Sequence, residues 1–130
     1  MTKLKIYLAS KLYHADVVKN LVICNTYDVT WTNRWQWFEG VVDDTEQFAQ
    51  HFWENDFDDI DAADCVVIYG VVGDELKGAL VEAGYAIAKG KPVYCVGGSA
   101  SFGTWQYSQR VETFDNLNAL AIYLGVRQYP

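Results

Sequence analysis

Short apolar runs alternate with longer amphipathic segments along this chain. The apolar runs are rich in β-branched and aromatic residues, as buried strands are, whereas the segments between them repeat their apolar positions every three or four residues, as helices do. The pattern predicts strands within 3–10, 27–31, 65–69, 90–98 and 110–114. It predicts helices at 13–24, about 44–63, 78–90 and 115–125.

This alternation predicts an α/β fold. Strands separated by helices form right-handed crossovers, which place the strands in a parallel sheet with helices on both faces. We expect a single flavodoxin-like, doubly wound domain over residues 1–130, with about five parallel strands. Ligands of such sheets bind beyond the carboxyl ends of the strands, so the loops after Leu8, Trp31, Tyr69 and Val96 should carry the chemistry.

Composition and charge narrow the class of ligand. The chain has 130 residues, of which 51% are hydrophobic, enough for one folded core. It lacks a membrane-length apolar run and a secretory signal, so we expect a cytoplasmic protein with reduced cysteines. Its formal net charge of −7 argues against a nucleic-acid polymer or an anionic membrane as partner. Small molecules remain.

Cofactor motifs are absent from the expected positions. The first turn, "LASKLYH", has no glycine, so it does not match the dinucleotide fingerprint. A phosphate-binding loop starting at Gly73 would need Lys and Ser or Thr where Ala79 and Leu80 stand. His14 and His51 are far apart in sequence, which does not suggest a metal site. We therefore expect no cofactor and no metal.

The stretch "GALVEAGYAIAKG" contains one carboxylate, Glu82, among small and apolar residues. One interpretation is a solvent-facing stripe, because Glu75 and Lys89 lie seven residues to either side on the same helical face. The other is a functional carboxylate, because the small neighbours leave room for another molecule to approach. Such a carboxylate could act as a nucleophile or face a developing cation.

The acidic segment "ENDFDDIDAAD" poses the same question. Asp61 and Asp64 are expected to cap or flank secondary structure. Asp56 and Asp59 lie about one helical turn apart just before the strand at 65–69, so either one could reach the ligand crevice. The nearby tryptophans have two open roles, which are stacking on a ligand and packing between subunits.

Four stretches, "KIYLAS", "VTWTNRW", "NDFDDIDAADCVVIYG" and "GALVEAGYAIAKGKPVYCVG", together resemble the nucleoside 2-deoxyribosyltransferase family and its relatives that hydrolyse N-glycosidic bonds. The resemblance implies that Glu82 is the catalytic nucleophile and that Tyr7 orients it. It also implies that Asp56 contacts the sugar. Leu76 stands where many transferases of the family have a base-handling aspartate, which leaves Asp74 or Glu75 as the replacement.

Further substrate contacts follow from the same resemblance. We expect them from Ala9, Ser10 and Gly78 and, supplied by the 105–109 loop of a neighbouring chain, from Ser108 or Gln109. Trp35 or Trp37 could stack on the base. The expected partners are nucleosides and free nucleobases, and the expected assembly is a homo-oligomer. Three functions remain open at this point: deoxyribosyl transfer between bases, hydrolysis of a nucleoside or nucleotide, and nucleoside binding without catalysis.

Overall fold

One parallel sheet organises the chain, and the computed structural model describes residues 3–38, 45–98 and 100–129 of it. The strands are β1 (Leu4–Ala9), β2 (Val29–Trp31), β3 (Cys65–Tyr69), β4 (Val93–Val96) and β5 (Val111–Phe114). Their order is β2-β1-β3-β4-β5, and every neighbouring pair is parallel. This order confirms the predicted flavodoxin-like, five-stranded α/β fold.

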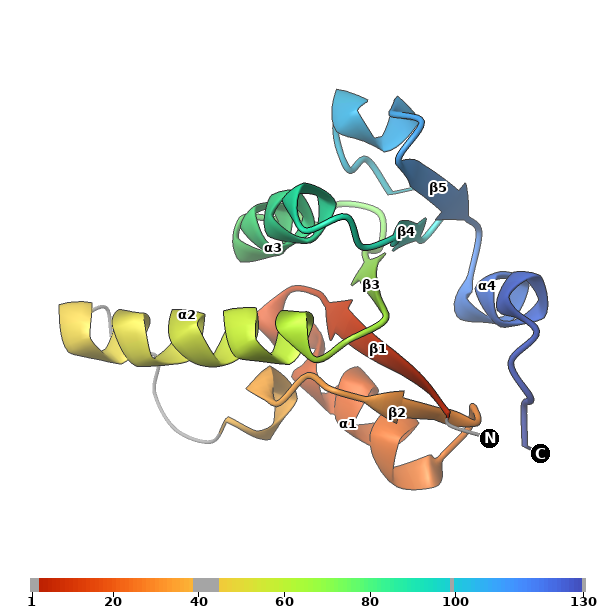
Figure 1. Ribbon diagram of the computed structural model, residues 1–130, viewed down its shortest axis with the longest axis horizontal. Coiled ribbons are helices and arrows are strands. Elements are labelled where there is room, and N and C mark those ends of the chain that lie inside the picture. Colours follow the sequence, from red (N-terminus) through yellow and green to blue (C-terminus); the bar gives the residue numbers. More distant parts are fainter. Residues whose placement is uncertain (1–2, 39–44, 99, 130) are drawn as a thin grey trace.

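Four α-helices cover the two faces of the sheet: α1 (Ala15–Cys24), α2 (Glu46–Asp61), α3 (Gly78–Ala88) and α4 (Leu117–Leu124). Figure 1 shows α2 and α3 on one face and α1 and α4 on the other. Three short 3-10 helices lie in the loops: η1 (Leu12–His14), η2 (Trp35–Trp37) and η3 (Thr104–Tyr107). The predicted helix at 13–24 thus begins with a 3-10 turn, and the predicted start near residue 44 lies outside the described residues.

The alternation of side chains in the strands creates two separate cores. In β1, Tyr7 and Ala9 join a cluster that includes the alanines of α3, whereas Ile6 joins a cluster with Leu120 of α4. Successive side chains of a strand point to opposite faces, so residue parity decides which helices each one meets. Tyr7 therefore points toward the α2 and α3 side of the sheet.

The cysteines lie within the strands and helices just described. Cys65 and Cys95 are buried within β3 and β4, as the sequence predicted, while Cys24 is exposed at the end of α1. All three cysteines are free. Within the described ranges, no helix has the length and apolar character needed to cross a membrane.

A tight contact between two loops should make Gly97 essential to stability. Gly97 follows β4 with φ +125°, and a Cβ there would overlap the carbonyl oxygen of Gly70. Gly97→Ala should therefore lower the free energy of unfolding by about 3 kcal/mol, measured by urea denaturation. Gly84→Ala is the control, because nothing lies within 4 Å of that position in α3 and alanine favours helix by about 1 kcal/mol. A Gly97→Ala protein as stable as wild type would contradict this packing.

Candidate active site

A cavity of about 750 Å³ lies on the α2 and α3 side of the sheet, beyond the carboxyl ends of β1 and β3. The loop after β1, the segment after β2, the loop after β3 and the two helices all contribute to it. Its lining residues are Ser10, Lys11, Leu12, Trp35, Phe38, Phe48, Ala49, Phe52, Trp53, Asp56, Glu75, Leu76, Lys77, Gly78, Ala79 and Glu82. Most of the expected site residues therefore meet at one place.

Glu82 lines this cavity and is otherwise buried. Only 7% of the residue is exposed, and the phenol of Tyr7, which is fully buried, donates a hydrogen bond to Glu82 Oε2. This confirms the expected contact across β1 and α3 and shows that the solvent-facing interpretation of Glu82 is wrong. Glu82 shares its helical face with the buried Ala79, Ala83 and Ala86. A run of alanines on that face leaves space for a carboxylate between helix and sheet.

Burial strongly affects the acid groups beside the cavity. It raises the pKa of Glu82 to about 8, the Tyr7 hydrogen bond opposes this rise, and the negative charges of Asp56 and Asp59 add to it. Burial likewise raises the pKa of Asp56 to about 7, with Asp59 adding to the rise and Arg34 opposing it. The pKa of Tyr7 is raised far above its ordinary value by burial and by Glu82, so Tyr7 remains a hydrogen-bond donor.

The structure separates the roles of the acidic residues near the end of α2. Asp56 lines the cavity, whereas Asp59 accepts hydrogen bonds from Arg34 Nε at 2.8 Å and from the Arg34 backbone N–H at 3.1 Å. Asp64 accepts from the backbone N–H of Lys5 at 2.8 Å, and Asp61 accepts from the hydroxyl of Tyr85 at 2.8 Å. Asp61 and Asp64 thus support structure, as predicted, and Asp56 is the acid of this segment that reaches the cavity.

Aromatic side chains make up much of the cavity wall. Trp35 is held in place by a 2.7 Å hydrogen bond from its Nε1 to the carbonyl oxygen of Leu8. Phe48 and Phe52 of α2 also line the cavity, and sequence reasoning missed them. Their signal was the spacing of residues 48, 52 and 56 at one helical repeat, which places both aromatics and Asp56 on one face. This wall can cover a flat heterocycle and exclude water.

The other predicted substrate residues divide into two groups. Ser10 and Gly78 line the cavity, and Ser10 Oγ also donates to the carbonyl oxygen of Tyr69 at 3.0 Å. Ala9 does not line it, because the side chain is fully buried in the core under the sheet face. Ser108 is exposed just after η3 and lies outside this cavity within one chain. Trp37 also stays outside, and 45% of it is exposed.

The loop after β3 distinguishes the two candidate replacements for the base-handling aspartate. Asp74 is engaged elsewhere, because its Oδ2 lies 2.8 Å from His14 Nε2. Glu75 lines the cavity beside Leu76. Glu75 is therefore the carboxylate of this loop that is available to a ligand.

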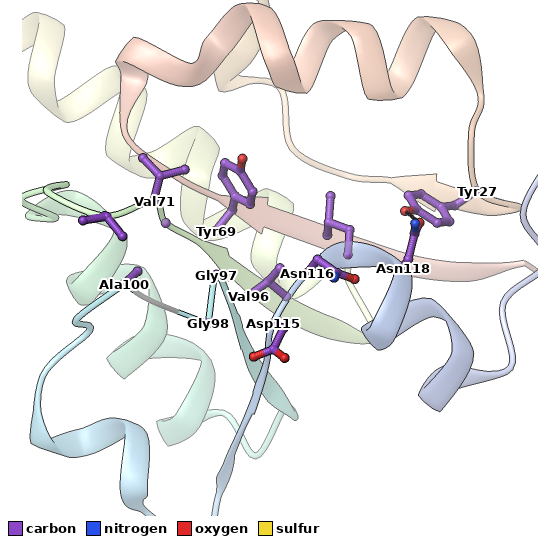
Figure 2. Close-up of a pocket in the computed structure, with 13 residues that line it drawn as sticks. Tyr27, Tyr69, Val71, Val96, Gly97, Gly98, Ala100, Asp115, Asn116 and Asn118 are labelled. Carbon is purple, nitrogen blue, oxygen red and sulfur yellow. Dashed lines mark hydrogen bonds between the residues drawn. The ribbon is translucent and has the colours of Figure 1, made fainter.

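A second cavity, of about 440 Å³, lies at the carboxyl ends of β3 and β4 (Figure 2). Its polar lining includes Tyr69, Asn116 and Asn118, and the hydroxyl of Tyr27 donates to Asn118 Oδ1. Among the described residues that line it, Asp115 is the single carboxylate. The loop after Val96 contributes here and not to the larger cavity, contrary to our expectation. The larger cavity, with several acid groups, is the better candidate for chemistry.

Metal binding has no support from the side chains. Within the described part of the chain, no cluster of three or more His, Cys, Asp or Glu residues could hold a metal ion. The groups that line the larger cavity include carboxylates, lysines and an aromatic wall.

Comparisons with known proteins point to one family. The family model for nucleoside 2-deoxyribosyltransferase matches residues 6–119. A 2-deoxyribosyltransferase from the psychrotolerant bacterium Bacillus psychrosaccharolyticus shares the fold with a TM-score of 0.66 and 20% identity, over 97% of this chain and 99% of that one. The CMP N-glycosidase BcmB of Clostridium botulinum has a TM-score of 0.53 and 16% identity, over 93% and 98% of the two chains. No curated protein sequence matches.

The buried carboxylate should make stability depend on pH. In the folded protein the pKa of Glu82 rises from 4.5 to about 8, so the folded state keeps a proton that the unfolded state has released. The free energy of unfolding should therefore fall as pH rises from about 5 to about 8, by up to about 1.4 kcal/mol per pH unit. Glu82→Gln should remove this part of the dependence.

Urea denaturation at several pH values measures this difference. Glu54→Gln is the matched control, because Glu54 is exposed on α2 and does not line the cavity. Its stability curve should run parallel to that of wild type. If the Glu82→Gln curve also ran parallel to wild type, the raised pKa of Glu82 would be wrong.

Proposed function

Because the chain belongs to the nucleoside 2-deoxyribosyltransferase family, enzymes that act on N-glycosidic bonds, we propose that it transfers a 2-deoxyribosyl group between nucleobases through a covalent intermediate on Glu82. The observation that carries this proposal is the buried Glu82 carboxylate, which is hydrogen-bonded by Tyr7 and lines an aromatic-walled cavity. A carboxylate removed from water and held by one donor is suited to covalent catalysis at a sugar carbon.

Glu82 takes part in both steps of this reaction, first as the nucleophile and then as the leaving group. With a pKa of about 8, Glu82 is ionised in only a minor fraction of molecules at neutral pH, and that fraction is the reactive one. The ionised carboxylate attacks the anomeric carbon of the nucleoside while the C–N bond breaks, and the electron pair of that bond leaves with the base. The departing base takes up a proton from solvent, which balances the proton that the incoming base releases to solvent in the second step. A nitrogen of a second base then attacks the same carbon, the bond to Glu82 breaks, and the proton of the incoming nitrogen is lost. The carboxylate of Glu82 is regenerated, so no cofactor is consumed.

The two oxygens of Glu82 have different surroundings, which supports different tasks for them. Oε2 accepts the hydrogen bond from Tyr7, which fixes the direction of the carboxylate. Oε1 lies toward Gly78, because a Cβ built at position 78 would be 3.9 Å from it. The atoms nearest to that position belong to the Trp53 ring, at 3.4 and 3.6 Å, so Gly78, Trp53 and Oε1 border the same part of the cavity. Oε1 is the oxygen that we assign to nucleophilic attack.

The rest of the cavity provides groups for sugar and base. Asp56 lines the cavity with a pKa of about 7, so its carboxyl is partly protonated at neutral pH and can both donate to and accept from a sugar hydroxyl. Trp35 and Phe52 can cover the faces of a base. Glu75, at the same cavity, is placed to meet the polar edge of the base where Leu76 cannot.

Hydrolysis is the second candidate, with water in place of the second base. Two lysines, Lys11 and Lys77, line the same cavity and could contact a 5′-phosphate, which favours a nucleotide substrate for such a reaction. Base release that needs no acceptor base would indicate hydrolysis. Nucleoside binding without either reaction would indicate a protein that binds but does not catalyse.

Loss of Glu82 should abolish the proposed transfer. Glu82→Ala should lower turnover by several orders of magnitude, since Glu82 supplies the nucleophile of the proposed covalent step. Tyr7→Phe should lower turnover roughly ten- to a hundredfold, because one orienting hydrogen bond is lost. Chromatography of a deoxynucleoside incubated with a different free base measures the exchange.

Two comparisons make this experiment decisive. Glu54→Gln changes an exposed carboxylate of α2 and should retain wild-type exchange. Circular dichroism should show that Glu82→Ala remains folded, since removal of a buried carboxylate does not open the sheet. Wild-type turnover in a folded Glu82→Ala protein would refute the role of Glu82.

We also propose that the chain works as a homo-oligomer. Several large apolar or aromatic side chains are exposed on single chains, including Trp37 at 45%, Val72 at 72%, Tyr107 at 81% and Ile122 at 81%. Monomers rarely leave extensive apolar surface in water, and a symmetric copy is the simplest cover. Ser108 lies next to Tyr107 and outside its own chain's cavity, so a role in the site requires a neighbouring chain.

Sedimentation equilibrium at micromolar concentration measures the assembly. The expected result is a mass at least twice that of one 14.7 kDa chain. Tyr107→Ser should shift the equilibrium toward monomer and lower exchange activity together, whereas Glu54→Gln should change neither. A fully active species with the mass of one chain would rule out a shared site.

A further inference from the structure

One side-chain contact, between His14 and Asp74, joins the two loops that border the larger cavity. His14, at the end of η1, follows the cavity-lining Ser10, Lys11 and Leu12, and Asp74 precedes the cavity-lining Glu75, Leu76 and Lys77. The Nε2 of His14 and Oδ2 of Asp74 lie 2.8 Å apart, and their side chains are 11% and 10% exposed. Neither side chain lines the cavity itself. Any effect of this pair on a ligand therefore acts through the neighbouring residues.

The turn that contains Asp74 depends on this aspartate. Asp74 Oδ2 accepts a hydrogen bond from the backbone N–H of Val71 at 3.0 Å, and the backbone N–H of Asp74 donates to the carbonyl oxygen of Val71 at 3.1 Å. Between them, Gly73 has a positive φ of +88°. The carboxylate thus closes the turn on itself and binds His14 with the same oxygen.

Packing does little to hold this turn from its other side. Val71 and Val72 are 38% and 72% exposed, and both line the second cavity, where Figure 2 shows Val71 beside Tyr69. Among the hydrogen bonds of the described residues, His14 makes the side-chain contact that reaches residues 71–77 from another element. Leu76 packs against the core on the α3 side, so His14 adds a polar link between this turn and the loop after β1 to the apolar support that Leu76 provides.

His14 is itself held firmly. Its ring meets the rings of Tyr13 and Tyr69 edge-on, with centroid distances of 5.5 and 5.8 Å, and its backbone N–H donates to the carbonyl oxygen of Lys11 at 2.9 Å. Tyr69 is the last residue of β3, so the ring is fixed against the sheet. A fixed imidazole is a suitable anchor for the turn at residues 71–74, where Val71 and Val72 are exposed.

The charge on Asp74 also suits this role. Burial raises the pKa of Asp74, but the Val71 N–H, His14 and the positive charge of Lys11 together lower it by more, so the net shift is downward. Asp74 is therefore ionised throughout the neutral range. A hydrogen bond to an ionised partner is stronger than one between neutral groups.

We propose that His14 and Asp74 form a positioning pair that holds the loop after β3 at the correct distance from the loop after β1 and so determines how tightly the cavity binds its ligand. The catalytic carboxylate is not part of this linkage, because Glu82 and Tyr7 are joined directly across α3 and β1. Loss of the pair should weaken ligand binding and leave the chemical step nearly unchanged. The expected changes in KM and kcat rest on the proposed function, whereas the expected changes in hydrogen exchange of the loop and in the affinity for a free base do not.

The test compares His14→Leu with His14→Gln. Leucine removes the ring nitrogen, while glutamine places an amide N–H at a similar reach and should restore the contact with Asp74. Hydrogen exchange followed by mass spectrometry should show faster exchange of residues 71–80 in His14→Leu and near-wild-type exchange in His14→Gln. Peptides from β4 serve as an internal reference and should be unchanged in both variants.

Ligand binding gives a second readout that does not need turnover. Trp35 and Trp53 line the cavity, so tryptophan fluorescence can follow the binding of a free nucleobase such as adenine. We expect the Kd for the base, and the KM in base exchange, to rise roughly tenfold in His14→Leu, as the loss of one charged hydrogen bond predicts. We expect kcat to change less than about threefold, since the geometry of Glu82 and Tyr7 is kept.

The outcomes separate this inference from the proposed function. Unchanged hydrogen exchange of residues 71–80 in a folded His14→Leu protein would overturn the anchoring role. Faster hydrogen exchange with an unchanged affinity for the free base would overturn the effect on binding. If wild type catalyses no exchange of nucleobases, the proposed function fails. Hydrogen exchange of residues 71–80 and the binding of a free base still decide the role of the pair in that case. If His14→Leu does not fold, Asp74→Asn provides the same comparison, since it keeps the shape of the side chain and removes its charge.

Discussion

The hydrogen bond from Tyr7 to Glu82 is the interaction on which the rest of the site depends. It joins the middle of the first strand to α3 in a place where little water enters, so the carboxylate has few partners other than this phenol. A buried carboxylate without a hydrogen-bond partner would strongly destabilise the folded state. With one donor, it is held in a fixed direction, and its raised pKa shows that burial still outweighs that single hydrogen bond.

Two features, the direction of side chains in β1 and the small residues of α3, allow this contact. The parity of β1 sends Tyr7 toward α3, and alanines at 79, 83 and 86 let the helix lie close to the sheet around Glu82. Oε1 of the Glu82 carboxylate lies near Gly78 and Trp53, and all three residues line the cavity. The small residues of α3 thus hold the helix against the sheet at the edge of the cavity.

Much of the fold could be predicted from the sequence because it rests on local periodicity. The βα alternation predicted the parallel sheet, whose observed order is β2-β1-β3-β4-β5. The resemblance to a known family, and not the periodicity, marked Tyr7, Asp56 and Glu82 as site residues. The burial of Glu82 could not be decided from periodicity, since a glutamate on a helix is equally compatible with a solvent-facing stripe. Its partner comes from a strand 75 residues away, and such long-range pairing leaves no trace in the local pattern.

Other features of the site were predicted wrongly or missed for related reasons. Ala9 was expected at the substrate, but its position in β1 turns the side chain into the core. Phe48 and Phe52 were missed because the amphipathic pattern of α2 does not tell which partner its aromatic residues meet, a neighbouring helix or a cavity. The pairing of His14 with Asp74 likewise joins two loops that are distant in sequence. Tertiary proximity, and not residue type, decides each of these cases.

The central claim is that Glu82 forms a covalent bond to the sugar. Mass spectrometry of the protein incubated with a fluorinated deoxynucleoside, whose glycosyl-enzyme breaks down slowly, tests it most directly. The account predicts a mass increase equal to one fluorinated sugar, located by peptide mapping in the α3 peptide that contains Glu82 and absent from Glu82→Ala. An adduct on another residue, or release of the base by wild type with no adduct at any time point, would contradict it.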